Sequence, residues 1–165
     1  MLRETWLWFY ERTRSRDQSE ASLADTLDVK ASILLVVIVF IATLVPDVLK
    51  VPGLSTFLRV CQAATAVILG AGIVVLTMEL WPRKYLFEDE QFLDELDAYL
   101  KESKDDLTEQ EVIQMLQNAC SEALYRVRRN YGLNNTKQRL LKVSAWLAII
   151  GLLLQVLILF VLAIM

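Results

Sequence analysis

Residues 143–165 read VSAWLAIIGLLLQVLILFVLAIM, 23 consecutive positions without a charged side chain. A helix that crosses the hydrocarbon core of a bilayer needs about 20 predominantly apolar residues, and roughly 17–25 are tolerated. This stretch therefore predicts a transmembrane helix. Val60–Met78 is also uncharged, over 19 residues, and Ala31–Val45 over 15. The shortest run has the length of a buried core helix. However, Val29 extends it and Lys30 can reach the interface, so we expect three spans.

The overall composition agrees with a helical membrane protein and excludes several kinds of site. The chain of 165 residues is 55% hydrophobic with a mean hydropathy of +0.41, and it holds only 5 Gly and 3 Pro. It has no His, and its two cysteines, Cys61 and Cys120, are far apart. We therefore expect no metal site, no cofactor and no enzyme activity. The net charge of −3 also argues against nucleic-acid binding.

The basic residues predict the orientation in the membrane. Fifteen of the 17 Lys and Arg residues lie before the first span or between the second and third spans. The other two, Lys50 and Arg59, flank the short connection between the first two spans. Because an excess of Lys and Arg marks the cytoplasmic side, we expect a cytoplasmic N-terminus and only residues 46–56 outside. Any signal should then arrive from the cytoplasm.

The first residues predict a helix of a different kind. Thr5–Tyr10 is rich in aromatic side chains, and Arg12, Arg14 and Arg16 follow it closely. Such a stretch is typical of an amphipathic helix that lies on the inner leaflet, and it lacks the features of a secretory signal. The alternative is that the aromatic side chains pack on the cytoplasmic helices. We therefore assign residues 1–28 to an interfacial helix and residues 29–81 to a transmembrane hairpin.

The segment between the second and third spans predicts two cytoplasmic helices. The first covers residues 87–104, with a break at Asp105-Asp106. Thr108 and Glu111 have the spacing of a capping box that starts the second helix, and Gly132 with the following asparagines suits its end. The domain organisation is therefore a cytoplasmic segment over 82–141 followed by a C-terminal span over 142–165. The fold class is an all-α membrane protein.

Charges are segregated along this cytoplasmic segment. Residues 88–111 carry 11 acids and 2 bases, whereas residues 112–142 carry 6 bases and 1 acid. An antiparallel hairpin would place opposite charges side by side, within one chain or between protomers. Arg126, Arg128 and Arg129 suit an anion or phosphate site. They equally suit a basic cluster that faces anionic membrane lipid and the acidic helix.

The spans themselves hold little chemistry. None has a charge at its centre, and Glu79 is expected at the cytoplasmic interface, so a proton pathway or an ion filter is not predicted. Small residues recur at four-residue spacing, which lets helices approach closely, either within the chain or in a homo-oligomer. These positions are Ala66 with Gly70 and Ser144 with Ala148.

One stretch carries a family resemblance. Residues 24–35 read ADTLDVKASILL, which is similar to the approach to the first span in the membrane domain of Pycsar effectors, bacterial antiphage proteins. Leu80–Arg83 resembles the exit from that family's second span, and Tyr125–Tyr131 resembles the basic helix that leads to the last span. We call the central residues of the first stretch the pre-span motif: Asp28, Lys30, Ala31 and Ser32.

The resemblance implies a function and its partners. In Pycsar systems a pyrimidine cyclase makes cyclic UMP or cyclic CMP, and the effector then impairs the bacterial inner membrane and kills the infected cell. The sequence suggests no appended cyclic-nucleotide-binding domain, so we expect the nucleotide to bind the cytoplasmic helices. The residues expected to contact it are Arg126, Arg128, Arg129 and Lys137. An alternative function is a constitutive scaffold that binds a protein partner through residues 88–131.

Overall fold

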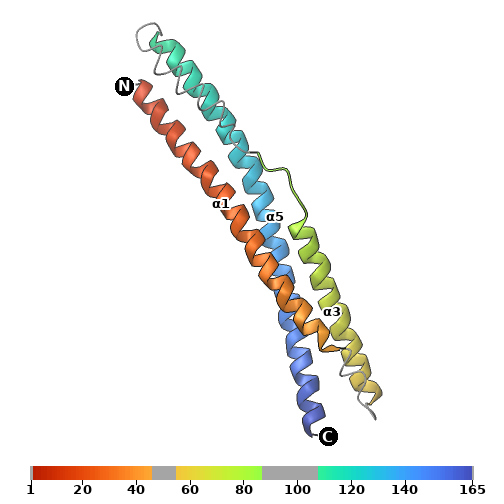
Figure 1. Ribbon diagram of the computed structural model, residues 1–165. Helices are drawn as coiled ribbons and strands as arrows, with labels where there is room; N and C mark the ends of the chain where they lie inside the picture. The colour runs from red at the N-terminus through yellow and green to blue at the C-terminus, as the bar shows by residue number, and fades with distance from the viewer. Residues whose placement is uncertain (1, 46–54, 87–107, 165) are drawn as a thin grey trace. The chain divides into compact units, whose positions relative to one another are not determined.

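The computed structural model describes residues 2–45, 55–86 and 108–164, and all the regular structure in these ranges is helical (Figure 1). The helices are α1 (Leu2–Thr43), α3 (Thr56–Leu80) and α5 (Glu109–Ile164). Each is long and apolar enough to cross a membrane. The predicted all-helical fold with three candidate spans is therefore confirmed. The predicted helix over 87–104, the break at 105–106 and the outer connection over 46–54 lie outside the described residues.

Local sequence explains where the helices begin and end. Ser55 caps α3 by accepting a hydrogen bond from the Leu58 amide at 3.3 Å. At the start of α5, the Thr108 amide and hydroxyl donate to the Glu111 carboxylate at 2.9 and 2.8 Å. The Glu111 amide donates back to the Thr108 hydroxyl, so the predicted capping box is confirmed. Helix α3 ends just before Pro82, which has no amide hydrogen to continue a helix.

The predicted helix end at Gly132 is wrong, because α5 continues without interruption to Ile164. A glycine inside a helix costs only about 1 kcal/mol relative to alanine. Asn130 and Asn134 are both buried, and their side chains bond other segments of the chain. These contacts need helical backbone at both positions, so they favour continuation over a stop. Similarly, residues 2–28 and the start of the first span belong to one helix.

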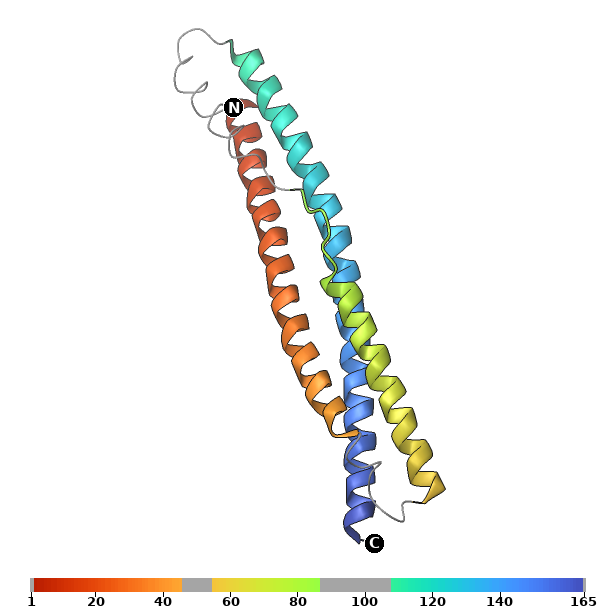
Figure 2. The same ribbon diagram turned by 45° about the vertical axis from the view of Figure 1, so that its right-hand side comes forward.

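The chain divides into two compact units. Unit 1 consists of Met1–Asp25 and Arg83–Asn135, and unit 2 of Thr26–Pro82 and Thr136–Met165. In unit 1, α1 lies beside α5 (Figure 2). Tyr10 of α1 packs there against Val112, Leu116 and Ala119 of α5. In unit 2, all three helices share one apolar core. Its buried members are Ala31, Ile38 and Ile41 of α1, Val45 shortly after α1, Leu69 and Leu76 of α3, and Ala148 of α5.

Buried residues recur at intervals of seven on every helix. On α1 one such series is Tyr10, Asp17, Ala24, Ala31 and Ile38, and Val45 continues it shortly after the helix. On α3 it is Leu58, Thr65, Gly72 and Glu79. On α5 it is Leu116, Ala123, Asn130, Lys137, Ser144, Gly151 and Ile158. A seven-residue repeat is the period of knobs-into-holes packing between helices. Leu124 and Tyr131 of α5 fall outside this series and are exposed.

Candidate functional site

The heptad face contains polar residues at positions that coiled coils normally fill with apolar side chains. We call this set the polar seam. In unit 1 it comprises Thr13, Asp17, Asn130 and Asn134, and in unit 2 Gln62, Thr65, Glu79, Lys137, Ser144 and Gln155. All are buried. A polar residue at such a position lowers stability but specifies which helices pair and in what register. The polar seam therefore specifies how the helices pair, and its contacts are described below.

In unit 1, an ion pair joins α1 to α5. The Arg126 Nε lies 3.0 Å from the Asp17 Oδ2, and the two side chains are only 13% and 8% exposed. The planar guanidinium presents several donors in a fixed geometry, so it can hold a carboxylate in one orientation. Nearer the start of both helices, the Thr13 hydroxyl lies 3.7 Å from the Cys120 sulfur.

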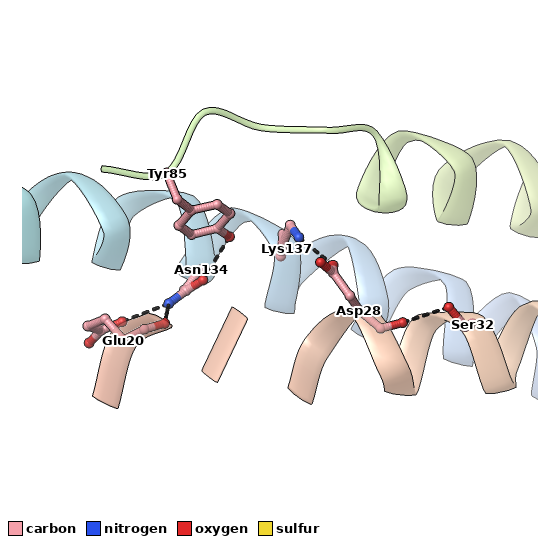
Figure 3. A network of polar contacts seen from close by, with 6 residues as sticks. All are labelled: Glu20, Asp28, Ser32, Tyr85, Asn134 and Lys137. Atoms are coloured by element: carbon pink, nitrogen blue, oxygen red, sulfur yellow. Dashed lines mark hydrogen bonds and ion pairs between the residues drawn. The ribbon is translucent and has the colours of Figure 1, made fainter. Parts of the chain in front are cut away.

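Two asparagines of α5 bind neighbouring segments of unit 1. The Asn130 amide nitrogen donates to the Leu86 carbonyl at 2.8 Å, and its oxygen accepts from the Leu86 amide at 3.2 Å. Asn134 donates to the Glu20 backbone carbonyl and carboxylate, each at 2.8 Å, and accepts from the Tyr85 hydroxyl at 2.9 Å (Figure 3). These amides therefore hold both α1 and the segment that follows α3 against α5.

In unit 2, the pre-span motif forms a second ion pair. The ammonium group of Lys137 on α5 binds the Asp28 carboxylate on α1 (Figure 3). The Lys137 side chain is 3% exposed, whereas that of Asp28 is 45% exposed. The Ser32 hydroxyl donates to the Asp28 backbone carbonyl at 2.8 Å, and Ala31 is completely buried. The motif thus supplies a carboxylate for a buried cation and a small side chain for close packing, while Lys30 is exposed.

Glu79 was predicted at the interface, but its side chain is completely buried in unit 2. Its neighbours on α3, Leu76 and Leu80, belong to or pack against the apolar core that also includes Ala31. All three helices of unit 2 therefore place a charged residue on or beside the packed face: Asp28, Glu79 and Lys137. Intramembrane or membrane-boundary charges of this kind usually have a functional role.

A second polar contact lies further along unit 2. The Gln62 amide nitrogen donates to the Gln155 oxygen at 3.0 Å and to the Val45 backbone carbonyl at 3.2 Å. The remaining Gln62 oxygen and Gln155 nitrogen are buried and have no hydrogen-bond partner among the described residues. Hydrogen bonds between spans are worth about 0.6 kcal/mol on average and rarely exceed about 1.7 kcal/mol. The pair therefore specifies helix pairing more than it stabilises it.

The predicted nucleotide-contacting residues separate into two groups. Arg126 and Lys137 lie toward the packed side of α5, and each binds a carboxylate of α1. Arg128 and Arg129 are exposed, and neither forms an ion pair with a described residue. A hollow of about 380 Å³ is lined by Ser121, Glu122, Tyr125 and Arg126. Within the described ranges, no cluster of acidic or cysteine side chains suits a metal ion.

The predicted helix-association residues also fall into two groups, one buried and one in open surroundings. Ser144 and Ala148 are buried, and the Ser144 hydroxyl bonds carbonyls of its own helix. Ala66 is exposed, and an added Cβ on Gly70 would meet no atom within 4 Å. The close approach of helices instead occurs at Gly151, where a Cβ would lie 2.5 Å from the Leu69 Cδ2 atom.

Sequence reasoning missed the contacts that the buried polar residues of unit 1 make. Asp17 and Asn130 had no assigned role, and Asn134 was taken for part of a helix stop. The signal that identifies them is their seven-residue spacing relative to apolar residues of the same helix, as in Asp17, Ala24 and Ala31.

Comparison with known proteins supports the resemblance noted from the sequence. A family model described as the Pycsar effector protein domain matches residues 13–164. Searches of curated proteins and of solved structures found no significant match. The matched region includes the pre-span motif and both ion pairs of the polar seam. The chain therefore belongs to the Pycsar effector family.

Proposed function

We propose that this protein is an antiphage effector that responds to a cyclic pyrimidine nucleotide, oligomerises and impairs the inner membrane. The observation that carries the proposal is the family match over residues 13–164 together with three candidate spans. The nucleotide, cyclic UMP or cyclic CMP, is made by a partner pyrimidine cyclase. The protein has no catalytic role in this scheme.

The proposed topology places the N-terminus in the cytoplasm and the spans in the bacterial inner membrane. Residues 29–81 and 142–165 form the membrane part, and residues 82–141 form the cytoplasmic segment. Residues 1–28 act as the interfacial part of the protein. The excess of basic residues outside the connection between the first two spans supports this orientation.

The proposed switch is the polar seam of unit 1. The nucleotide phosphate first meets Arg128 and Arg129, because both are exposed and unpaired with the described carboxylates. It then competes with Asp17 for Arg126, which loosens α1 from α5. Replacing one charge-assisted contact by another costs little, so the equilibrium between two helix arrangements can respond to ligand binding.

The energy available from such contacts is sufficient for a switch. A hydrogen bond to a charged group contributes about 1.5–3 kcal/mol. Moving a population from 1% to 99% active needs about 5.5 kcal/mol of preferential binding. Two or three phosphate contacts that exist only in the active state supply this amount. Lys137, which is 3% exposed and bound to Asp28, joins the contacts only after the helices move.

Dye release from liposomes tests the proposal. The purified chain is inserted into liposomes, and cyclic UMP, CMP, AMP and GMP are added separately. We expect one pyrimidine nucleotide to cause release, and the double charge reversal Arg128→Glu/Arg129→Glu to abolish it without loss of insertion. The matched control is Arg59→Glu, since Arg59 is also exposed but lies at the start of α3. Silence with all four nucleotides in inserted protein would contradict direct sensing and favour a scaffold that binds a protein partner.

A further inference from the structure

Unit 2 carries outward-facing basic and tryptophan side chains on all three of its segments. We call this set the basic belt: Lys30 of α1, Trp81 directly after α3, and Arg139, Lys142 and Trp146 of α5. All five are exposed, and the two tryptophans are 69% and 66% exposed.

The belt residues lie at one level of unit 2. Lys137 on α5 binds Asp28 on α1, and a Cβ added to Gly72 on α3 would contact Ile38 of α1 and Leu147 of α5. Counted along the three segments from these contacts, Lys30, Trp81 and Lys142 fall within about one turn of one another. Arg139 and Trp146 lie within about one turn of Lys142 on α5. The five side chains therefore surround the helices at one end of the shared core.

The positive charge of the belt is not neutralised by neighbouring carboxylates. In the described part of unit 2 the only acidic residues are Asp28, which binds Lys137, and Glu79, which is completely buried. Lys30, Arg139 and Lys142 form no ion pair with any described residue. The sequence holds no acidic residue after Glu122. Three cations thus face outward without an acidic partner in the part of the chain that the structure describes.

An apolar outer surface begins directly beside the belt. Ile33 and Val36 on α1 are 61% and 69% exposed, Met78 on α3 is 57% exposed, and Ile149 on α5 is 46% exposed. Exposed apolar side chains of a span face lipid tails, and a ring of Trp, Lys and Arg marks the level of the headgroups. The belt therefore lies where phosphate groups are found.

We infer that the basic belt is a binding surface for anionic phospholipid headgroups. Lysine and arginine side chains donate hydrogen bonds to phosphodiester oxygens, and the indole rings lie at the boundary of the acyl chains. A lipid with net negative charge, such as phosphatidylglycerol, satisfies the three cations. Zwitterionic phosphatidylcholine carries its own compensating cation, so it is bound less well. This inference concerns the lipid partner and does not depend on nucleotide sensing.

Native mass spectrometry of the full chain in neutral detergent tests this inference. Phosphatidylglycerol and phosphatidylcholine are added in equal amounts, and the retained lipids are counted. One basic residue near an anionic surface strengthens association about fivefold. We therefore expect wild-type protein to retain phosphatidylglycerol preferentially, and Lys30→Gln/Arg139→Gln/Lys142→Gln to lose most of a roughly hundredfold preference. Each single substitution should reduce the preference about fivefold.

The matched control is Arg59→Gln, which removes an exposed cation at the other end of α3 that is not part of the belt. It should keep the lipid preference of the wild type. Circular dichroism checks that each variant remains helical. If the triple variant does not fold, the lipid preference of the three single variants is compared with that of the wild type instead. Equal retention of the two lipids by the wild type would overturn the inference. So would a preference in the folded variants that equals the wild-type preference.

Discussion

The ion pair between Asp28 and Lys137 provides a sharp prediction, because its two partners differ in exposure. The Lys137 side chain is 3% exposed and that of Asp28 is 45% exposed. Replacing Asp28 by Asn leaves a buried ammonium without its carboxylate. Replacing Lys137 by Met leaves a half-exposed carboxylate that water can solvate, and it places an apolar side chain at a packed heptad position. The two substitutions should therefore have unequal effects.

The expected magnitudes follow from this asymmetry. Removing one partner of a fully buried ion pair costs about 3–5 kcal/mol, whereas exposed pairs contribute about 0.2–1 kcal/mol. Because solvent reaches Asp28, we expect Asp28→Asn to lower the free energy of unfolding by about 2 kcal/mol. Lys137→Met should change it by less than about 1 kcal/mol in either direction, since apolar replacement of a buried ion is often neutral or stabilising.

Equilibrium unfolding in mixed micelles, followed by circular dichroism, measures these differences. The double variant Asp28→Asn/Lys137→Met should be about as stable as Lys137→Met alone, because the buried ammonium that loses its Asp28 contact in the single Asp28→Asn variant is gone. Arg128→Gln is the control for removal of an exposed cation from α5. If Lys137→Met proves more destabilising than Asp28→Asn, burial of the lysine does not govern this contact and the reasoning is wrong.

Three further predictions concern other contacts. Gly151→Ala should destabilise unit 2 by about 1–3 kcal/mol in the same unfolding assay, because the added Cβ would overlap Leu69 of α3. Gly70→Ala is the control: its Cβ would meet no atom within 4 Å, so this variant should be neutral or slightly stabilising. Gln155→Leu should cost about 1 kcal/mol, and adding Gln62→Leu should recover part of this loss because both unsatisfied amide atoms are then gone. Hydrogen bonds from the threonine amide and hydroxyl of the capping box lower the pKa of Glu111 below its ordinary value of 4.5. The stabilisation of the α5 start is then complete at neutral pH and is lost as the pH falls through the lowered pKa. Amide protection factors at that end, which correct for the intrinsic exchange rate, should therefore fall there, but not in Glu111→Gln.

Sequence reasoning could identify features whose residues lie close together along the chain. The capping box was predicted because its partners are three residues apart, and such local contacts need no knowledge of other elements. The pre-span motif was identified by resemblance, but its carboxylate was not matched to Lys137. The two residues are 109 positions apart, and no local rule connects them.

The division of roles among the basic residues illustrates the same limit. Arg126 and Arg128 are two positions apart and chemically identical, so sequence reasoning placed them in one candidate site. Two positions on a helix differ by about 200° around its axis, so one side chain faces α1 and the other faces outward. Which side faces α1 depends on the packing partner.

The sequence by itself determined the fold class, the three candidate spans and the helix start at Thr108, because hydrophobic length and capping act locally along the chain. Only the tertiary structure decided which polar residues are buried and what they bind. It turned Asn134 from an expected helix stop into a contact with Glu20, and it buried Glu79. The physical reason is that burial and pairing depend on the register between helices, and that register is set by the packing of all the heptad positions together.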